Sequence, residues 1–224
     1  MTNSLNGRTI LLAGGTSAAG RAAARALLAA GAHVIVAAHD PEKLEVLAGN
    51  LPGLVTEVCD LTDESAVHGF AERVHATGGP VDGILHLVGG WRGGGGLAAQ
   101  TEEDFRFLEG SLTALRHVSR AFDADVRASP AGREAIVSST ALVRPLAGGA
   151  NYAAVKAASE AWTRALAHGF AKAARDAGEP LRAASVIFRV TTLDGLEDAL
   201  ADAYIGLFAR DAESVNDSVI DLSS

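Results

Sequence analysis

The sequence has little cysteine, no basic cluster and no long apolar run. Its single cysteine, Cys59, excludes an internal disulfide and is typical of a reducing compartment, so we expect a cytoplasmic protein. With 19 basic and 27 acidic residues, the formal net charge is -8 and no basic stripe forms, which argues against nucleic acid and anionic membranes as partners. The longest apolar stretch, residues 22–38, is interrupted by Arg25, Gly31 and His33 and predicts no membrane span. The first eight residues are polar and contain no signal-peptide core.

Small and apolar residues are abundant instead. The 224 residues are 48% hydrophobic and include 25 glycines, together with many alanines. A chain of this length can bury a sizeable core in one domain, and small residues let helices lie close to a sheet. We therefore expect residues 1–224 to form a single domain without a repeat or a linker.

A short apolar run followed by a glycine turn opens the chain. Thr9–Ala13 predicts a buried strand, Gly14–Gly20 follows it, and an alanine-rich helix then reaches Ala30. A dinucleotide-binding loop requires this order, because glycine lets the backbone approach a pyrophosphate and the helix N-terminus offers free N–H groups. The alternative is an ordinary turn between a strand and a helix.

Apolar runs then alternate with helical segments along the chain. This alternation predicts βαβ units, and right-handed crossovers turn such units into a doubly wound parallel sheet. The predicted fold is α/β, of the Rossmann type, with about seven strands and helices on both faces. Ligands bind such sheets at the carboxyl ends of the strands. The predicted later strands are His33–Ala38, Leu54–Cys59, Val81–Val88, Glu134–Ser138, Leu181–Val190 and Ser218–Leu222, and the later helices begin near Asp40, Thr62, Thr101, Tyr152 and Ala199.

The helix predicted over Tyr152–Ala177 carries a Tyr-x-x-x-Lys pair. Tyr152 and Lys156 are four residues apart, so their side chains share one face of the helix. An ammonium beside a phenol lowers the pKa of the phenol, which makes tyrosine a proton donor or acceptor near neutral pH. Such a pair also arises without function, as a half-buried tyrosine and a solvated lysine.

Ser139 completes a larger pattern, because it lies thirteen residues before Tyr152 at the end of a predicted strand. With the glycine turn and Lys156, it makes the whole chain resemble the short-chain dehydrogenase/reductase family. The resemblance implies an NAD(P)-dependent oxidoreductase that transfers a hydride between a nicotinamide and a carbonyl or alcohol substrate. It implies that Tyr152 is the general acid or base, that Ser139 hydrogen-bonds the reacting oxygen, and that Lys156 lowers the pKa of Tyr152 and holds the nicotinamide ribose.

The same resemblance assigns residues to the cofactor and none to a metal. Asp60 would accept a hydrogen bond from the adenine amine, and Thr191 or Thr192 would contact the carboxamide. The candidate cofactor-binding residues are Gly14, Thr16, Ser17, Ala19, Gly20, His39, Asp60, Leu61, Gly89, Tyr152, Lys156 and Thr191.

Four positions depart from the family pattern. Ala18 replaces the middle glycine of the turn and brings a methyl group to where the backbone approaches the phosphates. Only the last residue of the usual Asn-Asn-Ala-Gly remains in His86–Gly89. The helix asparagine of the family's proton relay is Ser111 here, which we include as a candidate catalytic residue. Phe188 and Arg189 replace the usual Pro-Gly and alter the loop on the nicotinamide side.

These departures leave two alternatives open. The first is a degenerate member that binds a dinucleotide as a sensor or scaffold without turnover, which the intact set of Ser139, Tyr152 and Lys156 opposes. The second is an enzyme similar to dihydropteridine reductase, whose aromatic loop the Gly89–Trp91 segment resembles. Such enzymes generally lack the serine.

The end of the second strand favours NADP(H) over NAD(H). Ala38 stands where an acid would read a free ribose 2′-hydroxyl, and His39 beside it can donate a hydrogen bond to a phosphate. We interpret Asp40 as a helix cap.

The helix that carries Tyr152 also predicts self-association, since the family usually pairs through it. Ala154, Ala158, Trp162 and Ala165 extend its apolar surface beyond one core stripe. We expect a homodimer or homotetramer, whose mass in light scattering would exceed the 22.9 kDa of one chain.

The substrate side is expected to be open. Few residues separate the sixth strand from the predicted helix Leu196–Arg210, and glycines 93–96 at the other rim are expected to be too mobile for a firm wall. Trp91 could lie flat on a substrate ring or anchor its own loop. The sequence therefore predicts a site for a bulky or flat carbonyl compound.

Overall fold

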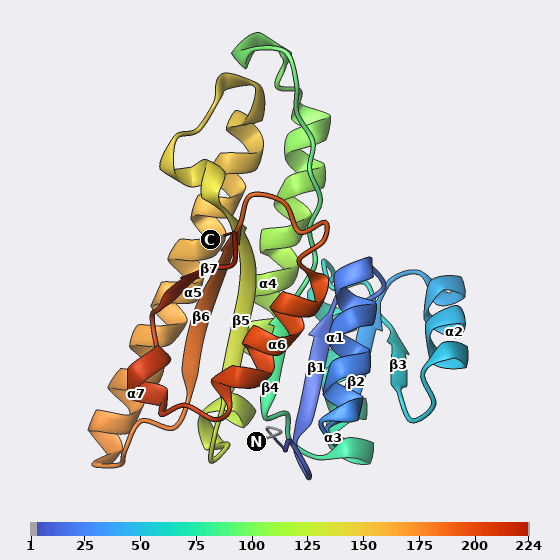
Figure 1. The fold of residues 1–224 in the computed structure, drawn as a ribbon, viewed down its shortest axis with the longest axis vertical. Coiled ribbons are helices and arrows are strands. Elements are labelled where there is room, and N and C mark those ends of the chain that lie inside the picture. Colours follow the sequence, from blue (N-terminus) through green and yellow to red (C-terminus); the bar gives the residue numbers. More distant parts are fainter. Residues whose placement is uncertain (1–3, 224) are drawn as a thin grey trace.

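The computed structural model describes residues 4–223, which contain a seven-stranded sheet (Figure 1). The strand order is β3-β2-β1-β4-β5-β6-β7, and every neighbouring pair is parallel. This arrangement confirms the predicted doubly wound α/β sheet. The strands are β1 (Thr9–Ala13), β2 (His33–Ala38), β3 (Val55–Val58), β4 (Gly83–His86), β5 (Arg133–Ser139), β6 (Ala184–Val190) and β7 (Val219–Asp221). The α-helices are α1 (Ala18–Ala29), α2 (Pro41–Asn50), α3 (Glu64–Gly78), α4 (Glu102–Ala128), α5 (Ala150–Ala177), α6 (Glu197–Leu207) and α7 (Ala212–Val215).

The strand order reverses at β1, and this reversal positions the site. β1 pairs with β2 on one side and with β4 on the other, so the connections that leave β1 and β4 run in opposite directions. A crevice opens between them at the carboxyl ends of the strands. The central strands are apolar along their length because both faces of the sheet are covered, and all five residues of β1 are buried.

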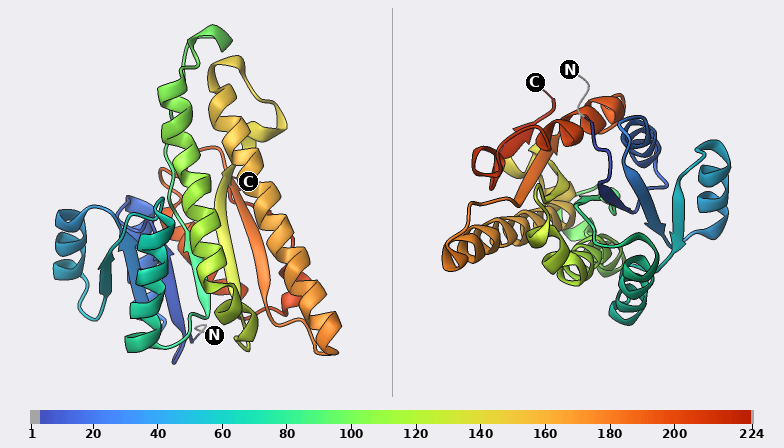
Figure 2. Two further views of the ribbon diagram at one scale, coloured as in Figure 1. Left: turned by 180° about the vertical axis from the view of Figure 1, so that it is seen from behind. Right: turned by 90° about the horizontal axis from the view of Figure 1, so that it is seen from below.

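Helices cover both faces of the sheet, as the sequence predicts (Figure 2). α1, α2, α6 and α7 share one apolar core with the strands, which includes Leu27, Leu44 and Tyr204. α3, α4 and α5 pack on the opposite face. There Phe70 and Phe122 meet edge to face with their ring centroids 5.7 Å apart.

The long helices α4 and α5 lie side by side and extend past the carboxyl edge of the sheet (Figures 1 and 2). They have 27 and 28 residues, and at about 1.5 Å per residue each is roughly 40 Å long. β5 and β6 have 7 residues each and span only about 23 Å. The overhang carries the glycine-rich segment before α4 and residues 140–149 before α5. No helix in the described part of the chain combines the length and apolarity that a bilayer crossing requires.

Element boundaries differ from the prediction where the chain leaves the sheet but stays buried. β3, β4 and β6 are shorter than the predicted strands Leu54–Cys59, Val81–Val88 and Leu181–Val190. Apolar character follows burial rather than strand pairing, so these runs continue past the last paired residue. α6 likewise ends before Arg210, and α7 has only four residues, too few for a periodic signal.

Trp162 belongs to the core rather than to an outer apolar face. It packs against a small buried cluster of Leu115, Ile136 and Ile187, and its Nε1 donates a hydrogen bond of 2.8 Å to Ser119 Oγ. Trp162 is therefore half-buried against α4, whereas Ala154, Ala158 and Ala165 on the same helix are exposed. Self-association itself stays a prediction.

Glu134 is a buried carboxyl group in the middle of the sheet. Only 1% of it is exposed, and neither side-chain oxygen has a hydrogen-bond partner among residues 4–223. Its neighbour in register on β6 is Ser185, which is also buried. Burial raises the pKa of Glu134 to about 8, because the apolar surroundings disfavour the carboxylate.

We expect this carboxyl group to make the protein less stable as pH rises. Between the unfolded pKa near 4.5 and the folded pKa near 8, the folded state holds a proton that the unfolded state has lost. The penalty therefore grows from about pH 4.5 and is fully present above about pH 8. Glu134→Gln imitates the protonated acid and should stabilise the protein by about 4 kcal/mol at pH 8, with almost no gain near pH 4.5. Urea unfolding at the two pH values measures this, and an equal gain at both would contradict it.

Candidate active site

The glycine turn after β1 is built for close approach. Gly14 has φ +81°, a conformation that favours glycine, and a Cβ there would lie 2.8 Å from the Val88 side chain. A Cβ on Gly20 would lie 2.0 Å from the carbonyl oxygen of Gly15, so the start of α1 presses directly on the turn. Ser17 caps α1 by accepting a hydrogen bond of 3.2 Å from the Gly20 N–H.

A cavity of about 370 Å³ extends from this turn across the ends of β2 and β3. Both His39 and Asp60 line it. Asp60 Oδ1 accepts hydrogen bonds from Thr62 N at 2.9 Å and from Thr62 Oγ1 at 2.6 Å, which lower the pKa of the carboxyl group and keep it ionised. Of the predicted cofactor-binding residues, Gly14, Thr16, Ser17, His39, Asp60, Leu61 and Gly89 line this cavity.

Lys43 also lines this cavity, and the sequence reasoning missed it. Asp40 caps α2, as predicted, by accepting a hydrogen bond of 3.1 Å from the Lys43 N–H. The Lys43 Nζ also lies 2.8 Å from Asp40 Oδ2. The sequence signal that could have identified Lys43 was its position three residues after Asp40, the acid that caps α2.

A second cavity, of about 390 Å³, continues the first toward Tyr152 and Lys156. Ser17, Leu87, Val88 and Gly89 line both cavities, so together they form one elongated channel over the carboxyl ends of the strands. Thr191 lines the second cavity, whereas Ala19 and Gly20 are buried beneath the turn and shape it. No cluster of three or more metal-ligating side chains occurs within residues 4–223.

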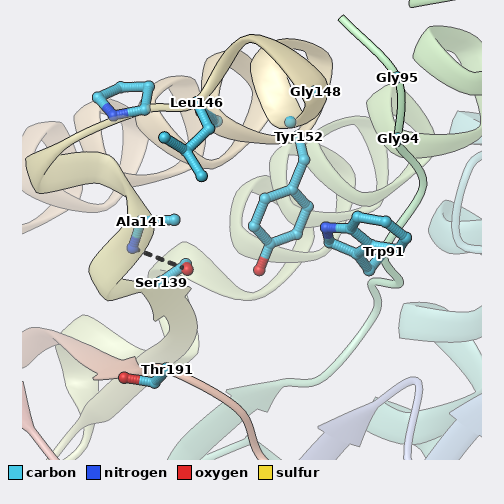
Figure 3. A pocket seen from close by; sticks show the side chains of 12 residues that line it. Trp91, Gly94, Gly95, Ser139, Ala141, Leu146, Gly148, Tyr152 and Thr191 are labelled. Carbon is cyan, nitrogen blue, oxygen red and sulfur yellow. Dashed lines mark hydrogen bonds between the residues drawn. The ribbon is translucent and has the colours of Figure 1, made fainter.

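Tyr152 and Ser139 face a third cavity, of about 460 Å³, where their hydroxyl groups point toward one another (Figure 3). α5 supplies the tyrosine and the end of β5 supplies the serine. Ser139 Oγ also accepts a hydrogen bond of 3.1 Å from Ala141 N, which fixes its rotamer. Tyr152 lines the second cavity as well, and so stands where the two cavities meet.

The pKa of Tyr152 differs from the sequence expectation. Burial raises it above its ordinary value, and the Ser139 hydroxyl acts in the opposite direction. The Lys156 ammonium lies 5.9 Å from the centre of the tyrosine ring and donates its hydrogen bond to the carbonyl oxygen of Val137 at 2.7 Å. Desolvation of the phenol therefore outweighs the ammonium, and Tyr152 is protonated at neutral pH.

Lys156 is a buried cation at the bottom of the second cavity. Burial lowers the pKa of its ammonium to about 8, and Glu160, one turn further along α5, acts in the opposite direction. Glu160 in turn forms two hydrogen bonds with Arg189, from Nε at 2.9 Å and from Nη2 at 2.6 Å. Arg189, which departs from the family pattern, is thus held in an ion pair with Glu160. The strand β6 remains paired with β5 through Val190.

Ser111 is buried on α4 and lines neither of the cavities that Tyr152 borders, so its relay role stays a prediction. Its hydroxyl donates a hydrogen bond of 2.7 Å to the carbonyl oxygen of Leu108 in its own helix. Its carbonyl oxygen accepts a hydrogen bond of 3.1 Å from His86 Nε2. His86, rather than Ser111, lines the second cavity.

The glycine-rich segment, residues 93–96, is fixed by hydrogen bonds to the loop before α5, and we call it the glycine wall. The Gly94 N–H donates a hydrogen bond of 2.8 Å to the carbonyl oxygen of Gly148, and a Cβ on Gly93 would lie 2.4 Å from that oxygen. Gln100 Nε2 donates to the carbonyl oxygens of Gly94 and Gly148 at 3.2 and 3.0 Å, and its Oε1 accepts from Asn151 N at 3.3 Å. These contacts correct the expected mobility, and the close approach at Gly93 and Gly148 requires glycine.

The comparisons with known proteins agree with this geometry. The family model for short chain dehydrogenases matches residues 8–174, and the chain therefore belongs to the short chain dehydrogenase family. The 2,3-dihydro-2,3-dihydroxybenzoate dehydrogenase of Bacillus subtilis is 28% identical over 166 residues, which cover 72% of this chain and 64% of the relative, just under two thirds of its length. The 3-oxoacyl-[acyl-carrier-protein] reductase of Haemophilus influenzae is 28% identical over 167 residues, covering 73% of this chain and 68% of the relative.

A solved structure extends the likeness of fold to the whole chain. A short chain dehydrogenase of Shigella flexneri in complex with NADP has a TM-score of 0.86 and 20% sequence identity, with 99% of each chain covered. At this identity the likeness shows the shared fold.

We expect Gln100→Ala to loosen the glycine wall, because it removes the donor and acceptor that join Gly94, Gly148 and Asn151. Amide hydrogen exchange over residues 89–100 should become roughly tenfold faster, as each lost hydrogen bond contributes about 1 kcal/mol. Leu97→Ala is the matched control, since this side chain lies in the same segment and is 69% exposed. Equal exchange in Gln100→Ala and the unmodified protein would show that backbone contacts alone hold the wall.

Proposed function

We propose that this protein is an NADP(H)-dependent oxidoreductase that interconverts a carbonyl compound and an alcohol with Ser139, Tyr152 and Lys156. The observation that carries the proposal is the position of Tyr152 at the junction of two cavities, one elongated and one apolar. Its hydroxyl faces that of Ser139 (Figure 3). A substrate oxygen between the two hydroxyls would therefore lie beside the end of the cofactor channel.

The channel fits an extended dinucleotide. The free N–H groups at the start of α1 would bind the pyrophosphate, as helix N-termini do for anions. Asp60 and Leu61 would hold the adenine, and Lys156 would donate to the nicotinamide ribose. Thr191 would contact the carboxamide. Ala18 is exposed at the first position of α1, so its methyl group leaves the N–H groups accessible.

A bound nicotinamide supplies or accepts the hydride, and the protein manages the proton. Because the pKa of Tyr152 is raised, the phenol is protonated at neutral pH and would donate its proton to the carbonyl oxygen during reduction. The Ser139 hydroxyl would donate a hydrogen bond to the same oxygen as its negative charge grows. The protonated phenol is the form that the reduction step requires.

We expect Tyr152→Phe to lower turnover by at least roughly 100-fold, because the ring remains and the transferable proton is removed. Affinity for the cofactor should change little, and fluorescence titration of NADPH checks this in the same preparation. Turnover is measured with a panel of carbonyl compounds. A variant as active as the unmodified protein would exclude Tyr152 as the acid. If the unmodified protein binds NADPH and reduces nothing in the panel, the sensor alternative gains support.

The preference for NADP(H) is supported by a lysine and a histidine, two hydrogen-bond donors, at the adenosine end of the channel. His39 and Lys43 line the cavity, and Ala38 contributes no carboxylate there. The Asp40 carboxylate accepts a hydrogen bond from the Lys43 N–H at the start of α2 and pairs with the Lys43 ammonium. Its negative charge is therefore already compensated by these two groups. A 2′-phosphate would meet the Lys43 ammonium and the His39 ring N–H, whereas a ribose 2′-hydroxyl would lack the acid that commonly recognises it.

We expect Lys43→Ala to weaken NADPH binding about tenfold and to leave NADH binding nearly unchanged, since a charged hydrogen bond contributes about 1.5 kcal/mol or more. Lys172→Ala is the matched control, because that exposed lysine pairs with Asp176 on α5 away from the channel. Titration of both cofactors with each variant measures the effect. Tighter binding of NADH than of NADPH by the unmodified protein would refute the preference.

The substrate cavity is neutral and largely apolar. Apart from Tyr152, its lining contains no ionisable side chain. Trp91 borders both cavities and is 64% exposed, and Leu146 on the opposite rim is 72% exposed. Trp91 is thus available to a ligand rather than anchored in the core. These features favour an uncharged, flat or bulky carbonyl compound over a small or anionic one.

Trp91→Ala should lower kcat/KM for aromatic ketones about tenfold, because the indole offers a stacking surface for a ring. The kcat/KM for small aliphatic ketones should change little. Steady-state kinetics with matched aromatic and aliphatic substrates measures both values. Higher kcat/KM for small aliphatic ketones in the unmodified protein would exclude the open, apolar site.

A further inference from the structure

His86 is a buried histidine at the end of β4. It is 5% exposed, and its register partners are Ala13 on β1 and Ile136 on β5. Its Nε2 lies 3.1 Å from the carbonyl oxygen of Ser111 on α4. A carbonyl oxygen can only accept a hydrogen bond, so Nε2 must carry the proton.

The second ring nitrogen of His86 is an unused acceptor. Burial is the largest influence on the pKa of His86 and lowers it to about 3, so the ring is neutral and has one proton, on Nε2. Nδ1 therefore presents a bare lone pair. It is fully buried and has no hydrogen-bond partner among residues 4–223. A buried acceptor without a partner destabilises the folded protein, so a donor at this place is favoured.

The Lys156 ammonium is a donor with protons to spare. The ammonium has three protons, and within residues 4–223 it donates one hydrogen bond, to the carbonyl oxygen of Val137. Lys156 and His86 line the same cavity, and the charge of Lys156 acts on the imidazole. Tyr152 is the other titratable group on this cavity, while the neighbours on α4 and β5, Ser111 and Ile136, are uncharged.

We propose that His86 is a positioning residue for Lys156: its Nδ1 accepts a hydrogen bond from the ammonium through one bridging water, and the Ser111 carbonyl oxygen holds the ring in the required tautomer. These hydrogen bonds, from the Ser111 carbonyl oxygen through the imidazole and the bridging water to the ammonium, then connect Lys156 to α4. The hydrogen bond to Val137 connects it to β5. The ammonium stays charged and aimed into the cofactor channel. The value of this for catalysis rests on the proposed function, whereas the hydrogen bond itself does not.

The sequence makes a direct measurement practical, because the chain has only three lysines, Lys43, Lys156 and Lys172. Protein labelled with ¹³C-lysine should give three ε-carbon signals, and Lys156→Arg identifies the one from Lys156. In the cofactor-free protein we expect this signal to titrate near pH 8. In His86→Leu, the loss of the acceptor should move the midpoint down by roughly one pH unit. Lys43 and Lys172 are exposed and serve as internal references.

Two conservative variants separate the roles of the two ring nitrogens. The amide oxygen of His86→Asn can take the place of Nδ1, so the Lys156 midpoint should remain within about 0.3 pH unit of the unmodified value. The amide of His86→Gln can replace Nε2 but moves the acceptor, so its midpoint should fall as in His86→Leu. The alkaline limb of the pH profile for NADPH affinity should follow the same order.

An unchanged Lys156 midpoint in folded His86→Leu would overturn the proposal, as would equal shifts in the asparagine and glutamine variants. Near-ultraviolet circular dichroism verifies folding, and the asparagine variant still tests the proposal if the leucine variant fails to fold. A shift in Ser111→Ala as large as in His86→Leu would transfer the role to the serine hydroxyl and also overturn it. Because the midpoint is measured without substrate, an inactive protein would refute the proposed function and leave this result intact.

Discussion

The hydrogen bond from Lys156 to the carbonyl oxygen of Val137 is the contact on which the site depends. It joins α5 to β5 at 2.7 Å, from a buried ammonium that has few other acceptors. Val137 lies two residues before Ser139, and Lys156 lies one helical turn after Tyr152. Because both intervals are rigid secondary structure, this contact helps to position the tyrosine hydroxyl relative to the serine hydroxyl.

Holding a lysine in this place costs stability. Its pKa falls to about 8 because burial disfavours the charge, and only hydrogen bonds and nearby opposite charge offset that cost. Glu160 supplies the opposite charge, and the Arg189 guanidinium keeps Glu160 ionised through two hydrogen bonds. Arg189, one of the two residues that replace the family's Pro-Gly, therefore still affects Lys156. It does so through Glu160, which lies one helical turn after Lys156 on α5.

Glycine has two different physical roles around this site. At Gly14 the positive φ and the closeness of Val88 shape the turn that a phosphate would approach. At Gly93 and Gly148 the missing side chains let two loops touch backbone to backbone beside the third cavity, which Gly94 and Gly148 line. Gly14 therefore leaves room for a ligand at the turn, whereas Gly93 and Gly148 bring two backbone segments together without a side chain between them.

The sequence by itself determined the features that depend on neighbouring residues. These are the glycine turn between β1 and α1, the shared helix face of Tyr152 and Lys156, and the alternation that produces a parallel sheet, since periodicity and turn chemistry are local. The tertiary structure decided which distant groups meet. His86 and Ser111 are 25 residues apart, and Gln100 and Gly148 are 48 apart, so no spacing rule links them. It also decided that burial rather than the ammonium dominates the pKa of Tyr152, because desolvation depends on the atoms that pack around a group and not on its sequence neighbours.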